Sequence, residues 1–315
     1  MNTKKRTKWG EKPYYSLDYY LKEQFGQKVY KVALEGGMTC PNRDGTLDTR
    51  GCIFCSNGGS GEFATACTNS VTEQIDHAIA FVNSHGKYTG EKYIAYFQSF
   101  SGTYAPVEKL RNLYMEALSH PKIVGLSIGT RPDCFSPAIY ELLEECNQIK
   151  PVWLELGLQT IHENTAKFIR RGYSLPVFEE CVKELRKRQL SVITHVILGL
   201  PGETTEHILQ TIDYLNTKDI QGIKFHLLHI LKGTDLAEYL PKLRIYTQEE
   251  YISLLLKCIA RLSPDIVIHR LTGDGPKDIL LAPDWSRNKR NVLNSIAHAL
   301  KKEGIFQGMN YRKDG

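Results

Sequence analysis

The feature that most constrains the fold is a regular alternation of short apolar runs with helical segments that carry one polar face. The six apolar runs predicted to be strands span residues 29–34, 93–98, 123–130, 152–159, 191–200 and 222–231. Start signals for helices, such as Ser136-Pro137, lie between them. Strands that are apolar almost throughout are typical of a parallel sheet with both faces covered. The alternation therefore predicts βαβ units with right-handed crossovers.

Six such units predict an α/β fold, a partial (β/α)6 barrel of the TIM type; a doubly wound sheet is the alternative. The predicted barrel occupies residues 27–241. An aromatic and basic extension precedes it at residues 1–26, and a C-terminal extension at residues 242–315 would close the barrel and could contact substrate. In this architecture chemistry gathers where the strands end, so residues at the strand ends are the first candidates for a functional site.

The composition excludes several classes of protein. Hydrophobic residues make up 42% of the 315 residues and charged residues 24%, which is typical of a globular chain. The basic first ten residues are not followed by an apolar segment, so we expect no secretory signal, and no stretch is apolar enough to predict a membrane span. The eight cysteines are then expected to be ligands or core residues of a cytoplasmic protein rather than disulfides. The net charge of +5 permits a polyanionic partner without requiring one.

Three cysteines lie in one glycine-rich loop directly after the first predicted strand. Cys40, Cys52 and Cys55 have the spacing Cys-x11-Cys-x2-Cys. Three thiolates can hold three irons of a four-iron cluster and leave the fourth iron open to another ligand. Arg43 and Arg50 could offset the negative charge of such a cluster. The loop therefore favours a 4Fe–4S cluster bound by Cys40, Cys52 and Cys55.

A zinc site is the alternative interpretation of this loop. Cys67 would complete a set of four thiolates, the number found in closed structural zinc sites. Against zinc, only one close Cys-x2-Cys pair is present. A zinc-stabilised nucleic-acid-binding protein without catalysis thus stays open on the loop alone, and so do the roles of Cys67 and Cys134. The residues interpreted as core rather than metal ligands are Cys146, Cys181, Cys258, His195, His226 and His229.

Polar residues follow several of the predicted strands, where packing alone does not explain them. Thr103 and the amides near Gly102 could bind an amino or carboxylate group. The C-terminal extension offers a second set of candidates, at Asp274, Trp285, Arg287, Lys289 and Arg290. An aromatic side chain interleaved with Arg and Lys is typical of stacking on a base beside phosphates. A packed closing segment with solvated charges is the alternative.

These motifs resemble those of the radical S-adenosylmethionine superfamily. The chain looks most similar to the bacterial YhcC/YtqA-type family, which is related to the catalytic subunit of Elongator and, more distantly, to oxygen-independent coproporphyrinogen oxidases. The resemblance runs from about residue 13 to residue 308. The eleven residues between Cys40 and Cys52 depart from the common superfamily spacing of three but match the closer family.

The resemblance implies S-adenosylmethionine as the cofactor on the open iron. It places Gln159 near the ribose, Arg171 near the methionine carboxylate and the segment around Gly199 near the adenine. The whole set of candidate cofactor-binding residues is Gln98, Thr103, Thr130, Glu155, Gln159, Arg171 and Gly199. The segment after Gln98 lacks a glutamate that is common there in the superfamily.

The function that the resemblance implies is a radical enzyme that reductively cleaves S-adenosylmethionine to a 5′-deoxyadenosyl radical. Its implied substrate is transfer RNA, at the C5 side chain of the wobble uridine, where carboxymethylaminomethyl groups are processed. A one-electron reductant such as flavodoxin or ferredoxin would be a partner. A radical enzyme acting on a porphyrin-like or peptide substrate is the alternative. The residues themselves identify no catalytic side chain.

Overall fold

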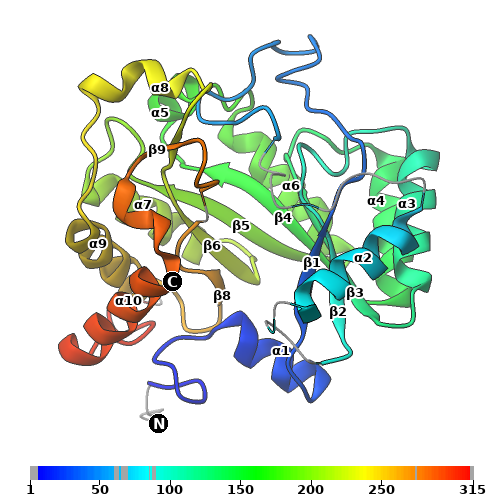
Figure 1. The fold of residues 1–315 in the computed structure, drawn as a ribbon, viewed down its shortest axis with the longest axis horizontal. Helices are drawn as coiled ribbons and strands as arrows, with labels where there is room; N and C mark the ends of the chain where they lie inside the picture. Colours follow the sequence, from blue (N-terminus) through cyan, green and yellow to red (C-terminus); the bar gives the residue numbers. More distant parts are fainter. Residues whose placement is uncertain are drawn as a thin grey trace.

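The computed structural model describes residues 6–59, 64, 70–84, 86, 90–273 and 275–312. Seven strands form one parallel sheet in the order β1-β2-β3-β4-β5-β6-β8. The strands of this sheet are β1 (Tyr30–Leu34), β2 (Tyr93–Phe97), β3 (Ile123–Thr130), β4 (Val152–Gln159), β5 (Ser191–Leu198), β6 (Gly222–Leu227) and β8 (Val267–Arg270). The sheet curls into a half-barrel with β1 and β8 at its two ends (Figure 1). A short antiparallel pair, β7 (Ile230–Leu231) and β9 (Leu280–Ala282), lies beyond the end of β6.

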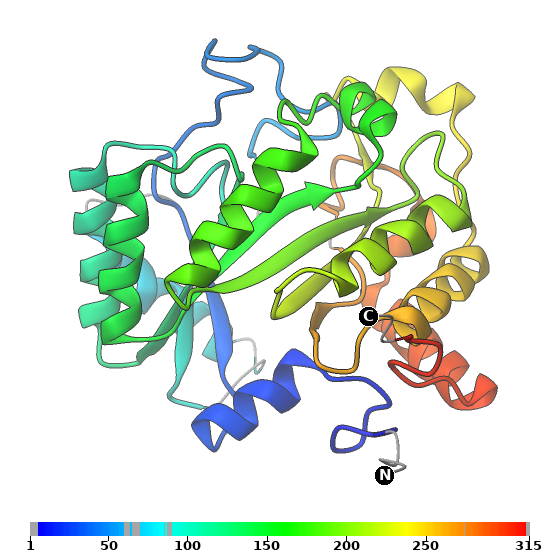
Figure 2. The ribbon, with the colours of Figure 1, turned by 180° about the vertical axis from the view of Figure 1, so that it is seen from behind.

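Helices cover the outer face of the curled sheet (Figure 2). Those between the strands are α2 (Val71–Ser84), α3 (Val107–Ser119), α4 (Pro137–Ile149), α5 (Glu163–Phe168), α6 (Leu175–Lys187), α7 (Thr205–Asn216), α8 (Leu236–Tyr239), η1 (Leu240–Lys242) and α9 (Gln248–Arg261). Outside them are α1 (Leu17–Phe25), η2 (Asp284–Arg287) and α10 (Lys289–Glu303). Ser136 and Thr204 cap α4 and α7 as their sequence positions predict, because each hydroxyl accepts a backbone N–H of the first turn. None of the described helices is long and apolar enough to span a bilayer.

Alternation along the strands divides the side chains between a large core and the barrel interior. Outward residues such as Val32, Leu126 and Phe225 are buried against the helices in the main core. At the amino ends of the strands, Trp153 and Ile193 join Leu21 of α1 in a separate apolar cluster. This cluster, which also contains Val29 and Ile94, forms an apolar floor beneath the barrel. The loop after β1 lies at the opposite, carboxyl end, at the top of Figure 1.

Both ends of the described chain meet beside this floor. The amide of Ile268 on β8 donates to the carbonyl of Tyr15, and Ser16 forms a parallel bridge with Ile268. The amide of Tyr15 donates to Gln307 Oε1 at 2.8 Å, and the amide of Gln307 donates to the carbonyl of Pro13 at 2.9 Å. The base of the barrel is therefore completed by residues nearly three hundred positions apart.

The predicted partial barrel is confirmed, with two differences. The sixth predicted run ends at Leu227, and its last residues form the separate strand β7. The C-terminal extension also supplies a seventh parallel strand, β8, which the sequence did not predict. With four residues, two of them His269 and Arg270, β8 is too short and too polar to resemble a buried strand.

Candidate active site

A cavity of about 2160 Å³ fills the inside of the half-barrel. It extends from the loop after β1, at the carboxyl ends of the strands, down to the apolar floor, where Leu17 and Leu21 of α1 line it. Its walls come from all seven strands of the large sheet, and residues of α2 and α10 also line it. The position at the carboxyl ends of parallel strands is where sites of this architecture form.

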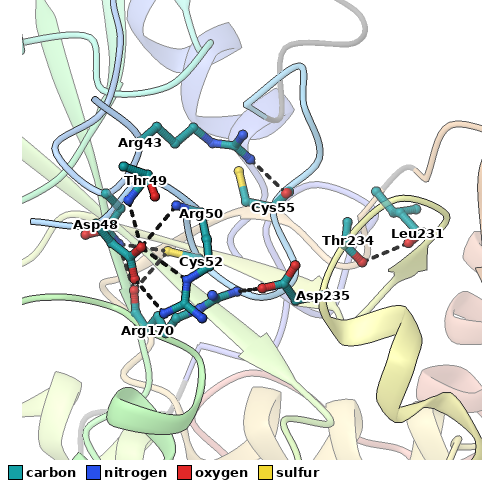
Figure 3. A network of polar contacts seen from close by, with 11 residues as sticks. Arg43, Asp48, Thr49, Arg50, Cys52, Cys55, Arg170, Leu231, Thr234 and Asp235 are labelled. Atoms are coloured by element: carbon teal, nitrogen blue, oxygen red, sulfur yellow. Dashed lines mark hydrogen bonds and ion pairs between the residues drawn. The ribbon is translucent and has the colours of Figure 1, made fainter. Parts of the chain in front are cut away.

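The three predicted cluster cysteines all line this cavity. Cys40, Cys52 and Cys55 form no disulfide and are half-buried, and Figure 3 shows the loop around the latter two. Arg43 holds this loop closed, because its guanidinium donates to the carbonyls of Cys55 and Ser56 at 2.8 and 2.6 Å. Burial raises the pKa of the Cys52 thiol to about 12. Cys67 lies outside the described residues, so the fourth thiolate of the zinc alternative has no described position.

Asn42 and Arg170 tie the cysteine loop to the segment after β4. Asn42 Nδ2 donates to the carbonyl of Arg170 at 2.7 Å and lies 3.5 Å from Cys52 Sγ. The guanidinium of Arg170 forms an ion pair with Asp235, at 2.5 Å (Figure 3). Among the described residues, no three His, Cys, Asp or Glu side chains converge tightly enough to hold one metal ion. A cluster does not require such convergence, because each thiolate binds a different iron.

The end of β4 carries strained backbone and an unpaired polar atom. Gln159 has φ of +68°, in the left-handed region that costs a non-glycine residue energy. Its Oε1 is buried without a hydrogen-bond partner among the described residues, and so is the hydroxyl of Ser101 after β2. Both residues line the cavity. Strain and orphaned acceptors at one cavity wall are typical of a binding site whose ligand completes the contacts.

The other predicted cofactor residues divide into cavity-lining and supporting ones. Gln98 and Thr130 line the cavity. Thr103 is fully buried, and its hydroxyl bonds Thr130 Oγ1 at 2.6 Å and the carbonyl of Cys134 at 2.7 Å, so it supports the wall from behind. Gly199, with φ of +92°, faces the ring of Tyr246 and does not line the cavity. Direct contacts of Thr103 and Gly199 with a cofactor are not supported by these positions.

Arg171 is held by the protein itself. Its guanidinium donates to the carbonyls of Thr160 and Tyr173 at 2.6 and 3.0 Å, to that of Leu158 at 3.3 Å, and to Glu163. Its side chain is only 2% exposed. Since four of the five N–H groups have partners, a bidentate hold on a carboxylate is not available in this conformation. Arg171 fixes the turn after β4 instead.

We expect Arg171→Met to destabilise the fold by on the order of 2–3 kcal/mol, because buried carbonyl groups lose their donors. Urea denaturation measures this, with Arg111→Met as the control, since Arg111 forms a surface pair with Glu145. If Arg171→Met keeps its unfolding free energy and loses affinity for S-adenosylmethionine, Arg171 binds the methionine carboxylate, as the resemblance implies.

A layer of charged side chains lies between the cysteine loop and the apolar floor. Glu155 on β4 is fully buried. Its Oε1 accepts from Lys31 Nζ at 2.6 Å and Ser127 Oγ at 2.7 Å. Its Oε2 contacts Lys224 Nζ and lies 3.0 Å from His195 Nε2. These partners occupy the acceptor positions of the carboxylate, so Glu155 holds this charged layer together and is not free for a cofactor.

Burial dominates the protonation states of this layer. It would raise the pKa of Glu155, but Lys224 and Lys31 hold that pKa well below its ordinary value. Burial, with repulsion from Lys31 and Arg270, lowers the pKa of Lys224 to about 7. Burial also lowers the pKa of His195 to about 4 and that of His226 well below its ordinary value. The layer therefore combines a carboxylate, cationic groups and neutral imidazoles.

Sequence reasoning missed most of this layer. His195 was interpreted as a core residue, yet it lines the cavity beside Glu155. Lys31 and Lys224 are charges in the middle of predicted buried strands. Burying an unpaired charge is costly, so a lysine within each predicted strand indicates a partner of opposite charge inside the barrel. Arg270 was not predicted to face the cavity because its strand, β8, was not predicted.

The C-terminal substrate candidates lie in two environments. Trp285 is half-buried, donates from Nε1 to the carbonyl of Tyr246 at 2.9 Å and does not line the cavity, so packing explains it. Arg287 lines the rim but fastens its own segment through Asp284 and the carbonyl of Leu280. Lys289 and Arg290, at the start of α10, also line the rim. Asp274 lies outside the described residues.

Comparisons with known proteins agree with this geometry. A family profile described as the Radical SAM superfamily matches residues 49–215, and one described as the Radical_SAM C-terminal domain matches residues 220–302. The chain is 43% identical to the uncharacterized protein YtqA of Bacillus subtilis, over 96% of this chain and 94% of that protein. It is 38% identical to protein YhcC of Escherichia coli, over 90% of this chain and 91% of that one. Among solved structures, the archaeal Elp3 of Methanocaldococcus infernus superposes with a TM-score of 0.66 at 17% identity, over 89% of this chain and 64% of Elp3.

Proposed function

Because the chain belongs to the radical SAM superfamily, we propose that it binds a 4Fe–4S cluster through Cys40, Cys52 and Cys55 and reductively cleaves S-adenosylmethionine. The observation that carries this proposal is the position of the three cysteines, which form no disulfide, come from one loop and line one cavity at the carboxyl end of the barrel. Three protein thiolates are the number that leaves one iron open.

The residues around the cavity fit these two groups. Soft thiolate ligands select iron–sulfur clusters over hard cations. The unpaired Oε1 of Gln159 and hydroxyl of Ser101 offer hydrogen-bonding groups to a ligand beside the cysteine loop. Gln98 and Thr130 add polar groups to the same wall. We propose Gln98, Thr130 and Gln159 as the residues that bind S-adenosylmethionine, with Thr103, Arg171 and Gly199 shaping the wall around them.

The chain contributes position and shielding to the chemistry. When bound, the cluster and S-adenosylmethionine supply an electron and a 5′-deoxyadenosyl radical that abstracts hydrogen from the substrate. Arg43 and Asn42 fix the cysteine loop against the barrel mouth. The apolar floor borders the inner end of the cavity. An external one-electron donor of the flavodoxin or ferredoxin type would reduce the cluster.

Anaerobic reconstitution tests this proposal directly. Reconstituted protein should be brown, contain about four irons and four sulfides per chain, and form 5′-deoxyadenosine from S-adenosylmethionine with dithionite. A colourless protein that carries stoichiometric zinc and forms no 5′-deoxyadenosine would instead favour the zinc-stabilised binding protein.

For the substrate, we propose transfer RNA modified at the C5 side chain of the wobble uridine. Two observations support a polyanion of this kind. The described residues that line the cavity include six Lys and six Arg but only three Asp or Glu, whereas the whole chain has 40 basic and 35 acidic residues. The cavity lining also includes two exposed apolar side chains, Phe81 on α2 and Leu293 on α10, at 57% and 38%. Apolar groups within a positive surface suit a base beside phosphates. The Elongator-type resemblance supports the same substrate.

If transfer RNA binds across this rim, replacing Lys289 and Arg290 together with alanine should weaken binding and flatten its salt dependence. Each phosphate contact contributes roughly 0.7–0.9 to the slope of log affinity against log salt, so two contacts give about 1.4–1.8 units. A filter-binding series across salt concentrations measures the slope. Arg287 is left intact because it fastens its own segment.

The matched control removes the same two charges from the other end of α10, with Lys301→Ala and Lys302→Ala. Both residues are exposed and lie away from the cavity rim. If both double variants lose the same RNA affinity, binding depends on the total charge of the protein and not on contacts at Lys289 and Arg290. Wild-type protein without salt-dependent RNA binding would favour a peptide or porphyrin-like substrate.

A further inference from the structure

The charged layer inside the barrel has more positive than negative groups. Lys31, Lys224 and Arg270 face the cavity, and Glu155 is the one carboxylate among the described residues of this layer. Lys31 and Lys224 both use that carboxylate as their counter-ion, and both ammonium groups also lie over the ring of Tyr96, at 5.0 and 4.5 Å. This leaves Arg270 as the cation of the layer without a counter-ion.

The side chain of Arg270 makes no hydrogen bond or ion pair with any described residue, although it is half-buried and lines the inner cavity. It lies close enough to Lys224, His195 and His226 to disfavour their protonated forms. Buried guanidinium groups in proteins are normally paired, because leaving one unpaired in a poorly solvated space is costly. The layer is also incomplete elsewhere, since His226 Nε2 and His269 Nδ1 have no described partner.

We propose that the inner end of the cavity is a binding subsite for a carboxylate carried by the substrate, with Arg270 as the residue that holds it. The proposal rests on the proposed function, and it names the chemistry of the substrate group that enters the barrel. A guanidinium matches a planar carboxylate with two parallel N–H donors. Lys31 and Lys224 add a positive field behind it, and the neutral imidazole of His226 borders it without adding charge.

The position of the subsite favours a carboxylate over a phosphate. The layer lies between the strands, directly above the apolar floor formed by Trp153 and Ile193. A carboxylate at the end of a side chain can reach this depth, whereas the phosphates of a polynucleotide stay with its backbone. The rim cations and Arg270 therefore have separate tasks, and Arg270 selects which side chain enters.

Acetate and acetamide are matched probes for this subsite, because they have nearly the same shape and differ in charge. Reconstituted protein saturated with S-adenosylmethionine is titrated with each probe in chloride-free buffer, followed by saturation-transfer NMR. The bound S-adenosylmethionine keeps acetate from the open iron. We expect acetate to bind and acetamide not to bind. Arg270→Gln should weaken acetate binding on the order of tenfold or more, and Arg270→Lys should restore part of it.

Arg244→Gln is the control, because Arg244 is exposed and pairs with Glu250 outside the cavity. The proposal fails if acetamide binds as well as acetate, if Arg270→Gln binds acetate normally, or if inorganic phosphate binds more tightly than acetate. None of these titrations contains RNA. A protein that binds acetate through Arg270 but binds no transfer RNA would keep this subsite and refute the proposed substrate.

Discussion

Alanine at Cys40, Cys52 or Cys55 should abolish cluster assembly, whereas alanine at Cys67 should leave it intact. Each of the three residues would be the sole protein ligand of one iron, so the loss of any thiolate removes a bond that nothing else in the loop replaces. Iron and sulfide analysis after anaerobic reconstitution measures the effect. We expect the three variants to lose essentially all bound iron and all 5′-deoxyadenosine formation.

Cys67→Ala is the matched control, since it removes a thiol from the same region of sequence. Cys258→Ala is a second control. Cys258 is fully buried in the main core, and no other cysteine lies near it in the sequence. If Cys67→Ala loses metal as completely as Cys52→Ala does, four thiolates hold the metal and the open coordination position disappears. The zinc interpretation would then replace ours.

Glu155→Gln should destabilise the fold by about 3–5 kcal/mol, because it leaves the buried Lys224 and the half-buried Lys31 without their counter-ion. The amide keeps the shape of the side chain, so the loss reports charge rather than packing. Urea denaturation of wild type and variant measures the difference. The double variant Glu155→Gln, Lys224→Met should recover part of the loss, since it also removes one of the stranded ammonium groups. Equal stability of wild type and Glu155→Gln would mean that the layer is solvated.

The loss in Glu155→Gln should also depend on pH, in a direction set by Lys224. Folding lowers the pKa of Lys224 from its ordinary value to about 7. Between that pH and the ordinary pKa the unfolded chain binds more protons than the folded one, so the contribution of Lys224 to stability rises with pH. A neutral Lys224 needs no counter-ion. Without Glu155 the pKa of Lys224 falls further, so the deficit of Glu155→Gln should shrink as the pH rises to about 7 and stay level above it, where Lys224 is neutral in both folded proteins.

The sequence predicted the fold class because its apolar runs are long and sharply bounded. The strands β3 and β4 have the predicted limits, since eight residues of nearly continuous hydrophobicity leave little choice. β8 could not be predicted in this way. It is a strand because β6 and the backbone of Tyr15 offer hydrogen bonds on either side of it, and both partners are distant in sequence.

The candidate site was predictable at the cysteine loop and much less so elsewhere. The spacing of Cys40, Cys52 and Cys55 predicts a metal-binding loop, and the structure places all three residues on one cavity. By contrast, Arg171 and Trp285 resemble ligand-binding residues in the sequence but use their donors on backbone carbonyls of the same chain. Which acceptor an arginine or an indole finds is decided by tertiary contacts. The pairing of Lys31 with Glu155 joins residues on β1 and β4, and no local pattern encodes it.

The junction of Pro13 and Tyr15 with Ile268 and Gln307 has a consequence for how the molecule assembles. Contacts with such large sequence separation raise the contact order, and loop closure on this scale slows folding. During synthesis the first helix is made long before its partners on β8 and after α10. Until then the apolar floor has no lower boundary, and Leu21 and Trp153 remain open to water. The base of the nascent half-barrel is thus exposed until β8 and the residues after α10 have been made, which is the period when a chaperone would be needed most.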